Sequence, residues 1–140
     1  TLADRFHKMG REFGASTGRK RRCGWLDLVL VRYAAMVNGF SDLAITILDG
    51  LDDCPEIPVC THYELDGKKL LLPPASAKDF DRVVPVYENL PGWECDTTKV
   101  QNYDDLPENA RAYLARIEKE TETRVSLVGV GPSRDQTIVR

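Results

Sequence analysis

Two short apolar runs rich in β-branched residues place the strongest limit on the fold of this chain. Leu43–Leu48 and Arg124–Val128 have the length and composition of buried strands, and each is preceded by a segment with helical periodicity. Alternation of helices with buried strands is typical of α/β folds whose sheets contain parallel strands. The sequence therefore predicts an α/β architecture with flanking helices.

The two expected helices are indicated by different signals in the sequence. Trp25–Asn38 carries apolar residues at helical spacing and ends at Asn38–Gly39, a good C-terminal stop. Pro107 suits the first position of the second helix, which continues to about Thr121. The residues at helical spacing in the first helix are Leu26, Val29, Leu30, Tyr33, Ala34 and Val37. In the second helix, an apolar stripe is formed by Ala110, Tyr113, Leu114 and Ile117. A further helix is expected near the N-terminus, from Leu2, Phe6, Met9 and Phe13.

A β-hairpin is expected between the parallel elements. Val59–Leu65 alternates like a strand, Asp66–Gly67 is a strong turn signal, and Lys68–Leu72 returns as the partner strand. One or two helical turns are expected within Ser76–Arg82. Val83–Glu88 then reads as an edge strand, because its proline cannot donate to a ladder, and Leu90–Trp93 reads as a turn.

Charge is concentrated in one window. Between Arg5 and Arg22 there are seven Lys and Arg residues and one acid, whereas the rest of the chain has twelve basic and twenty-one acidic residues. One positive site on an acidic protein favours a small anionic ligand over nucleic acid, which needs a broad basic face. No apolar run is long enough to span a membrane. Cys23, Cys54, Cys60 and Cys95 have no metal-like spacing, and we interpret them as free thiols of a cytoplasmic protein.

The basic window ends in the motif Gly14-Ala-Ser-Thr-Gly-Arg-Lys-Arg-Arg-Cys-Gly-Trp25. Small residues let the backbone approach a ligand, hydroxyls and amides donate hydrogen bonds, and arginines grip carboxylate or phosphate. Because alternate residues of an extended loop share a side, we expect Arg19 and Arg21 to converge and Lys20 and Arg22 to face elsewhere. The alternative is a solvated basic turn before a helix.

Two further candidate sites follow the buried strands. Asp49 stands at the end of the first strand, where α/β sheets bind ligands, and its carboxylate could accept both donors of a guanine base. Gly129–Gly131 follows the second strand, and its glycines allow close approach to a planar base. The alternative in both cases is an ordinary tight turn. His7 and His62 are interpreted as surface or strand residues.

Five blocks of the chain resemble the C-terminal portion of the adenylosuccinate synthetase family, in the family's order. They are Glu12–Asp27, Leu48–Asp52, Val59–Tyr63, Pro85–Trp93 and Gly131–Arg134. The resemblance implies the C-terminal part of a mixed, mainly parallel sheet with flanking helices and an inserted hairpin. It also implies a fragment, residues 1–140, of one larger synthetase domain whose phosphate-binding N-terminal part is absent.

The resemblance implies a GTP-dependent ligase that joins IMP and L-aspartate to give adenylosuccinate, GDP and phosphate, with Mg²⁺ and as a cytoplasmic homodimer. The loop that closes on aspartate matches Ala15, Ser16, Thr17, Gly18, Arg19, Lys20 and Arg21, with Arg19 also contacting IMP. The GTP site matches Arg21, Ile47, Leu48, Asp49, Gly129, Val130 and Gly131. The chain departs from the family at Ile47, commonly lysine, and at Gly129, commonly serine.

Other functional parts of the family have no counterpart in these residues. Its glycine-rich phosphate loop, catalytic aspartate and histidine, and metal ligand are not matched, so we expect no catalytic or metal-binding residue here and no activity from the isolated chain. We also expect marginal stability, since apolar sheet faces would be exposed. Two alternatives stay open: a stand-alone module that binds a nucleotide or nucleic acid without catalysis, and an inactive structural fragment.

Overall fold

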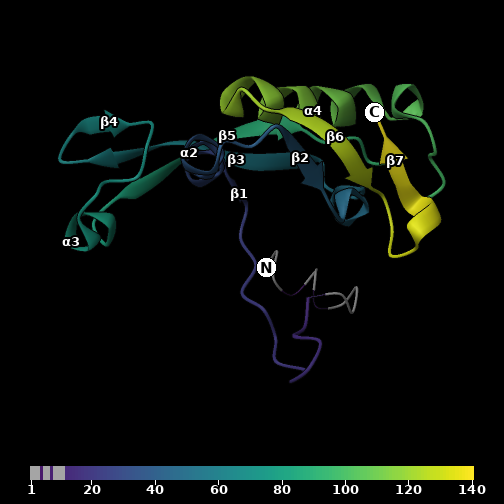
Figure 1. Cartoon of the computed structure of the whole chain (residues 1–140), viewed down its shortest axis with the longest axis horizontal. Helices are drawn as coiled ribbons and strands as arrows, with labels where there is room; N and C mark the ends of the chain where they lie inside the picture. The colour runs from purple at the N-terminus through teal and green to yellow at the C-terminus, as the bar shows by residue number, and fades with distance from the viewer. Residues whose placement is uncertain (1–3, 5–6, 8–11) are drawn as a thin grey trace.

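The computed structural model describes residues 4, 7 and 12–140, and its strands form two separate sheets (Figure 1). The four-stranded sheet contains β1 (Leu26–Asp27), β3 (Glu56–Leu65), β4 (Lys68–Leu70) and β5 (Val84–Pro91). The three-stranded sheet contains β2 (Asp42–Ile45), β6 (Arg124–Gly129) and β7 (Thr137–Val139). The helices are α2 (Leu28–Asn38), α3 (Ala77–Phe80) and α4 (Glu108–Thr121).

Strand pairing is mixed. β1 pairs with β3 and β2 with β6 in parallel, whereas β3 with β4, β3 with β5, and β6 with β7 are antiparallel. The α/β class and the inserted hairpin are thus confirmed, and the described strands contain both orientations in each sheet. β1, α2 and β2 form a strand–helix–strand unit, yet its two strands belong to different sheets.

The hairpin follows its turn signal closely. Asp66 and Gly67 both have positive φ, 51° and 75°, as a type I′ turn requires. β5 lies at the edge of the sheet, and Pro85 pairs opposite Tyr63. The turn expected at Leu90–Trp93 begins too early, because Leu90 and Pro91 still pair with β3.

Helix α2 begins three residues later than expected. Asp27 caps its N-terminus by accepting hydrogen bonds from Val29 N at 3.0 Å and Leu30 N at 3.2 Å, so Leu26 and Asp27 are free to pair with β3. The helix ends at Gly39, which has a φ of 60°.

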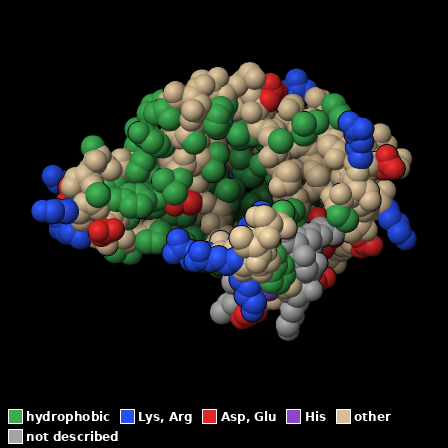
Figure 2. All heavy atoms as spheres, turned by 60° about the horizontal axis from the view of Figure 1, so that its bottom comes forward, with side chains coloured by type: hydrophobic (Ala, Val, Ile, Leu, Met, Phe, Trp, Pro, Cys, Tyr) green, Lys and Arg blue, Asp and Glu red, His purple; other side chains and the backbone are tan. Residues whose placement is uncertain are grey.

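The apolar residues of α2 are only partly buried, because they lie on both sides of the helix. Its buried residues are Leu28, Val29 and Ala35, whereas Leu30, Tyr33, Met36 and Val37 are between 42% and 59% exposed. A helix with apolar residues on both sides is normally covered on both sides. Figure 2 shows exposed apolar side chains gathered over the end of the molecule that carries α3 and β4.

Helix α4 matches its prediction and supplies much of the core. Ala110, Tyr113, Leu114 and Ile117 are buried and face the main cluster, together with Val125 and Val128 of β6. α4 lies along one face of the sheets in Figure 1. β2 is shorter and more exposed than expected: it ends at Ile45, its residues alternate between exposed and half-buried, and Leu48 belongs to the 3₁₀ turn η1 (Leu48–Leu51).

Three remaining expectations concern single features. Of the residues from which an N-terminal helix was expected, Leu2, Phe6 and Met9 lie outside the described part of the chain, and Phe13 forms an antiparallel bridge with Lys20 instead of belonging to a helix. The four cysteines are free thiols. Within residues 4, 7 and 12–140, no helix has the length and hydropathy needed to cross a bilayer.

Candidate functional site

The basic loop, residues 12–25, is a narrow hairpin that projects below the sheets in Figure 1. Phe13 and Lys20 form an antiparallel bridge, and Gly14 N donates to Arg19 O at 2.8 Å. Gly18 has a φ of 63°, and its N donates to Gly14 O at 2.8 Å. This left-handed conformation favours glycine at position 18. Every residue from Ala15 to Arg22 is exposed. The loop is therefore defined by its own backbone and opens to solvent.

Cationic residues line a shallow hollow in this loop. Its lining comprises Gly14, Thr17, Arg19, Lys20, Arg21 and Arg22. All four consecutive cations border this hollow, and Arg22 also borders the second cavity described below. Thr17 Oγ1 accepts a hydrogen bond from Arg19 N at 3.3 Å, which places a hydroxyl beside the arginine backbone.

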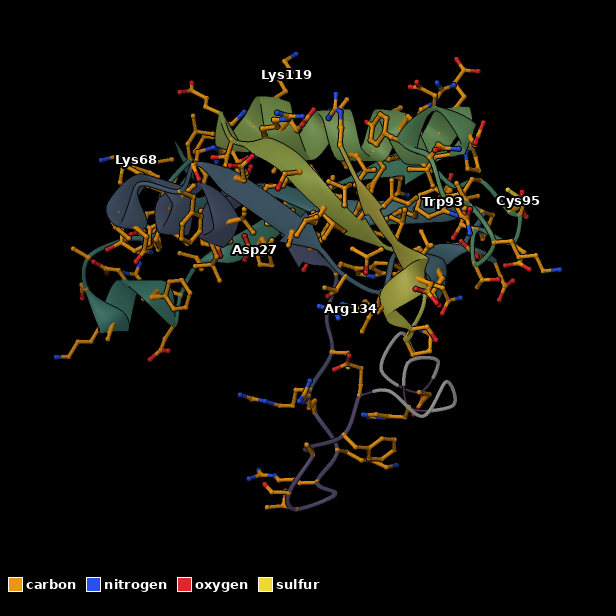
Figure 3. The ribbon with its side chains drawn as sticks, turned by 45° about the vertical axis from the view of Figure 1, so that its right-hand side comes forward. Asp27, Lys68, Trp93, Cys95, Lys119 and Arg134 are labelled. Carbon is orange, nitrogen blue, oxygen red and sulfur yellow. The ribbon has the colours of Figure 1, made fainter. Side chains whose placement is uncertain are left out.

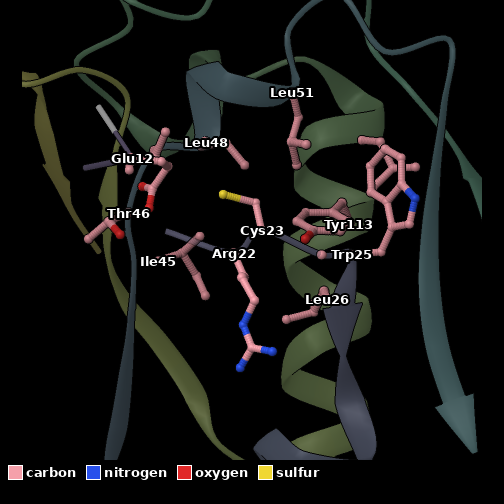
Figure 4. Close-up of a pocket in the computed structure, with 13 residues that line it drawn as sticks. Glu12, Arg22, Cys23, Trp25, Leu26, Ile45, Thr46, Leu48, Leu51 and Tyr113 are labelled. Carbon is pink, nitrogen blue, oxygen red and sulfur yellow. The ribbon is translucent and has the colours of Figure 1, made fainter. Parts of the chain in front are cut away.

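A second cavity, of about 380 Å³, lies where the loop meets the sheets (Figure 4). Arg22 and Cys23 border it on the loop side, and Ile45, Thr46 and Ile47 border it on the side of β2. Tyr113 of α4 contributes to its wall, and Figure 4 shows Arg22 extending between Ile45 and Leu26. Sequence reasoning did not single out Arg22 or Tyr113 for this position, since one is the last cation of a run and the other reads as core.

The ends of the parallel strands β2 and β6 lie side by side. β2 and β6 are neighbours, with Ile45 paired to Val128. The backbone of Gly129 lies against the residues after β2: a Cβ built on Gly129 would be 3.6 Å from Thr46 Cα and 3.8 Å from Ile47 N. These are ordinary contact distances, so this position could hold the serine expected of the family. The structure thus brings the Ile47–Asp49 and Gly129–Gly131 segments together.

Ile47 adopts an unusual backbone conformation at this point. Its φ of 59° and ψ of 39° are left-handed, a region that a β-branched residue rarely enters because Cβ crowds the following carbonyl. Such strain costs on the order of 1–2 kcal/mol and persists only where the surrounding structure enforces it. No sequence pattern signals it, because isoleucine favours the extended conformation of a strand.

Asp49 lies in η1, four residues beyond the end of β2, and is 8% exposed. Asp52 lies one short turn later and is equally buried. Burial is the main cause that raises the pKa of Asp52, and the charge of Asp49 adds to it; hydrogen bonds from Trp93 and Thr97 act in the opposite direction. Two acidic residues therefore share one buried corner, and the sequence drew attention to only one of them.

The other candidate residues do not all meet at one point. The exposed part of the basic loop projects below the sheets (Figure 1), and Arg22 is the loop cation that lines the second cavity with Ile47 and Leu48. His62 lies in β3, as expected, with its Nδ1 2.9 Å from Thr61 Oγ1. His7 Nε2 lies 2.9 Å from Arg21 O. Over the described part of the chain, no three His, Cys, Asp or Glu side chains gather as a metal site would require.

Comparison with known proteins gives consistent matches. Residues 1–138 match the family model described as adenylosuccinate synthetase. The chain is 51% identical to the adenylosuccinate synthetase of Mycobacterium tuberculosis over 133 residues, which are 95% of the chain and 31% of that protein. It is 48% identical to the one of Koribacter versatilis over 137 residues, 98% of the chain and 31% of that protein.

A solved structure matches the fold as well. The fully ligated adenylosuccinate synthetase of Plasmodium falciparum superimposes with a TM-score of 0.93 and 34% sequence identity, over 99% of this chain and 34% of that one. The chain therefore spans about a third of the length of the relatives it matches.

Proposed function

The chain belongs to the adenylosuccinate synthetase family, and from this we propose that it is part of a GTP-dependent ligase that joins IMP to L-aspartate. In that reaction GTP phosphorylates the six-position oxygen of IMP. The amino group of aspartate then displaces the phosphate, giving adenylosuccinate, GDP and inorganic phosphate. The family match over residues 1–138 is the observation that carries this proposal.

We propose that the chain is a segment of one larger synthetase domain. Two features support this, besides the share of the relatives that it covers. The second apolar side of α2 is exposed. In addition, β1 and β2 lie in different sheets, and one edge of each of these two strands has no partner strand among the described residues. Both are expected where further parts of a polypeptide pack against a core.

We assign the basic loop to aspartate. The open hollow of Gly14, Thr17 and the four cations can surround a small dicarboxylate with hydroxyl, amide and guanidinium donors. In this assignment Ala15–Arg21 hold the two carboxylates and orient the amino group, while Arg19 also reaches IMP. Their exposure suits a loop that must admit a substrate before closing on it.

We assign the strand ends to the guanine base of GTP. Asp49 would accept hydrogen bonds from the ring N–H and the exocyclic amino group of guanine, a pair of donors that adenine lacks. Ile47 and Leu48 would supply contact area, and the backbone of Gly129–Gly131 would lie against the base. Low exposure favours selectivity, because water competes weakly for a buried carboxylate. Arg21 would contribute charge toward GTP from the loop.

The Mg²⁺ that the family uses is not assigned to this chain. The described residues do not form a suitable cluster of ligands, so we derive no step through the metal. We likewise assign no general base. Localisation in the cytoplasm and assembly as a homodimer remain predictions from the family.

Steady-state kinetics of the complete polypeptide that contains this chain test the proposal. Wild-type protein should form adenylosuccinate only when IMP, aspartate and GTP are all present. Arg19→Leu should raise the KM for aspartate about 10- to 100-fold, and also that for IMP, because a charge-assisted hydrogen bond is worth about 1.5–3 kcal/mol. Thermal unfolding should be unchanged, since Arg19 is exposed.

Normal Michaelis constants for both substrates would remove Arg19 from the aspartate site. No ligase activity in the wild type, together with binding of nucleic acid that weakens steeply with salt, would favour a stand-alone binding module instead.

A further inference from the structure

The segment Gly92–Thr98 follows β5 and leads toward α4. It forms hydrogen bonds with Asp52 and Gln136, which lie close to the ends of β2 and β6. We propose that this segment positions the guanine-binding residues, holding η1 through Asp52 and the turn after β6 through Gln136. The inference rests on the proposed function, because it gives these contacts a purpose in nucleotide selection. Neither the sequence motifs nor the family resemblance assigned a role to Asp52, Thr97 or Gln136.

The first contact is made through the Asp52 carboxylate, which receives hydrogen bonds from three donors of the segment. Trp93 Nε1 lies 2.7 Å from Oδ1, and Thr97 N lies 2.7 Å from Oδ2. The Thr97 hydroxyl lies 2.9 Å and 3.1 Å from the two oxygens. Asp52 N in turn donates to Asp49 O at 3.3 Å. The segment therefore fixes the short turn on which Asp49 lies.

The second contact is made through Gln136. Its side-chain amide donates from Nε2 to Thr98 O at 3.0 Å and accepts from Ser133 N at 3.1 Å. Its main-chain oxygen accepts from Val130 N at 2.8 Å. The same side chain packs against Gly131, since a Cβ built there would lie 2.2 Å from Gln136 Cδ. Gln136 thus connects Thr98 to the Gly129–Gly131 segment.

The segment is itself firmly anchored. Gly92 N donates to Pro55 O at 2.9 Å, and Asn109 Nδ2 donates to Gly92 O at 2.6 Å. The ring of Trp93 lies 6.0 Å from that of Tyr113 on α4. Figure 3 shows Trp93 and Cys95 at the end of the molecule far from Lys68 in the hairpin. A segment fixed on α4 and on the start of β3 can hold the two strand ends at a constant spacing.

The hydrogen bonds at Asp52 also have an electrostatic purpose. Asp52 and Asp49 are both buried, and burial, together with the nearby charge of Asp49, raises the pKa of Asp52. Donors from Trp93 and Thr97 offset part of that rise, so that Asp52 can remain beside Asp49 without displacing it. Removing one donor should therefore change the position of η1 before it changes the fold.

Two variants in the complete polypeptide test the inference. Thr97→Val keeps the shape of a fully buried side chain and removes only the hydroxyl donor to Asp52. Gln136→Met keeps a similar length and removes the bonds to Thr98 and Ser133. Thr61→Val is the matched control, because its hydroxyl contacts His62 on β3, away from these segments.

Isothermal calorimetry with GDP and steady-state kinetics provide the readouts. Thr97→Val and Gln136→Met should each weaken GDP binding and raise the KM for GTP about three- to tenfold, the effect of one lost hydrogen bond. Discrimination between GTP and ITP should fall, whereas kcat and the KM for aspartate should match those of Thr61→Val.

Unchanged affinity for GDP and unchanged KM for GTP in both variants would overturn the positioning role. Equal losses for all substrates with a lower melting temperature would also overturn it, because they would indicate a merely structural contact. Failure of the proposed function would look different: the wild type would bind GDP and respond to both variants, yet form no adenylosuccinate.

Discussion

The basic loop and the strand ends are held in opposite ways. The loop depends on one bridge and a few main-chain hydrogen bonds, and its residues are exposed from Ala15 to Arg22. The strand ends are packed into the body: Asp49 is buried, and Asp52 is held by buried Trp93 and Thr97. The difference indicates one site that forms around its ligand and one that is formed beforehand.

Electrostatics in the loop agree with this comparison. Arg21 lies 3.7 Å from Glu12, but its side chain is 56% exposed. An ion pair this open contributes little to stability, on the order of 0–1 kcal/mol. The guanidinium groups can therefore turn toward a ligand at low cost, whereas moving η1 would break several buried hydrogen bonds.

Gly92→Ala should give the largest effect and would test how tightly the 92–98 segment is docked. A Cβ at this position would lie 1.6 Å from Cys54 O, a backbone atom that cannot move aside without displacing the start of β3. Overpacking of this kind destabilises the fold by about 1–3 kcal/mol or more. We therefore expect calorimetry to show a melting temperature several degrees below that of the wild type.

Gly24→Ala in the basic loop is the control for that variant. Among the residues that the structure describes, no atom outside its chain neighbours lies within 4 Å of a Cβ built there, and the melting temperature of this variant should stay at the wild-type value. Equal destabilisation by the two substitutions would contradict the contrast between the loop and the strand ends.

Titration of Tyr113 should give a smaller effect. Tyr113 packs beside Trp93 and is 6% exposed, and burial raises its pKa from 10.0 to about 12. The folded state thus favours the neutral phenol more than the unfolded state does. Stability should fall as pH rises from 10 to 12, by about 1.4 kcal/mol per pH unit from this group.

The measurement is an ultraviolet difference titration of the wild type against Tyr113→Phe. Ionisation of Tyr113 near its ordinary pKa of 10 would show that water reaches the side chains packed against the 92–98 segment. The strand ends would then be as accessible to solvent as the basic loop, which would contradict the comparison.

Local signals in the sequence predicted the elements that depend on neighbouring residues. Asp66–Gly67 specified the hairpin, Gly39 ended α2, and the stripe of α4 faces the core. These features follow from turn geometry and from periodicity, both of which act over a few residues. Ile47–Asp49 and Gly129–Gly131 each follow a strand that the sequence indicated, and the two segments lie close together because those strands pair in parallel.

The rest depends on contacts between distant residues. Thr97 contacts Asp52, which is 45 residues away in the sequence, and Gln136 contacts Thr98, which is 38 residues away. No local sequence pattern predicts these two contacts. The sequence could not predict which side of α2 faces the core, because both sides of this helix are apolar. Arg22 lines the second cavity beside Ile45 of β2, a juxtaposition of residues 23 positions apart that no local pattern predicts.

A crossed comparison of two variants in the complete polypeptide tests the central claim most directly. Asp49→Asn and Arg19→Leu would be assayed for the KM of GTP, ITP and aspartate. We expect Asp49→Asn to raise the KM for GTP about tenfold or more and to reduce discrimination against ITP, because an amide cannot accept both guanine hydrogen bonds.

The KM for aspartate should stay normal in Asp49→Asn and rise only in Arg19→Leu. That crossed result would assign the preformed strand ends to the base and the open loop to the dicarboxylate. An Asp49→Asn protein that still discriminates fully between GTP and ITP, or an Arg19→Leu protein that loses GTP affinity and aspartate affinity equally, would contradict the account.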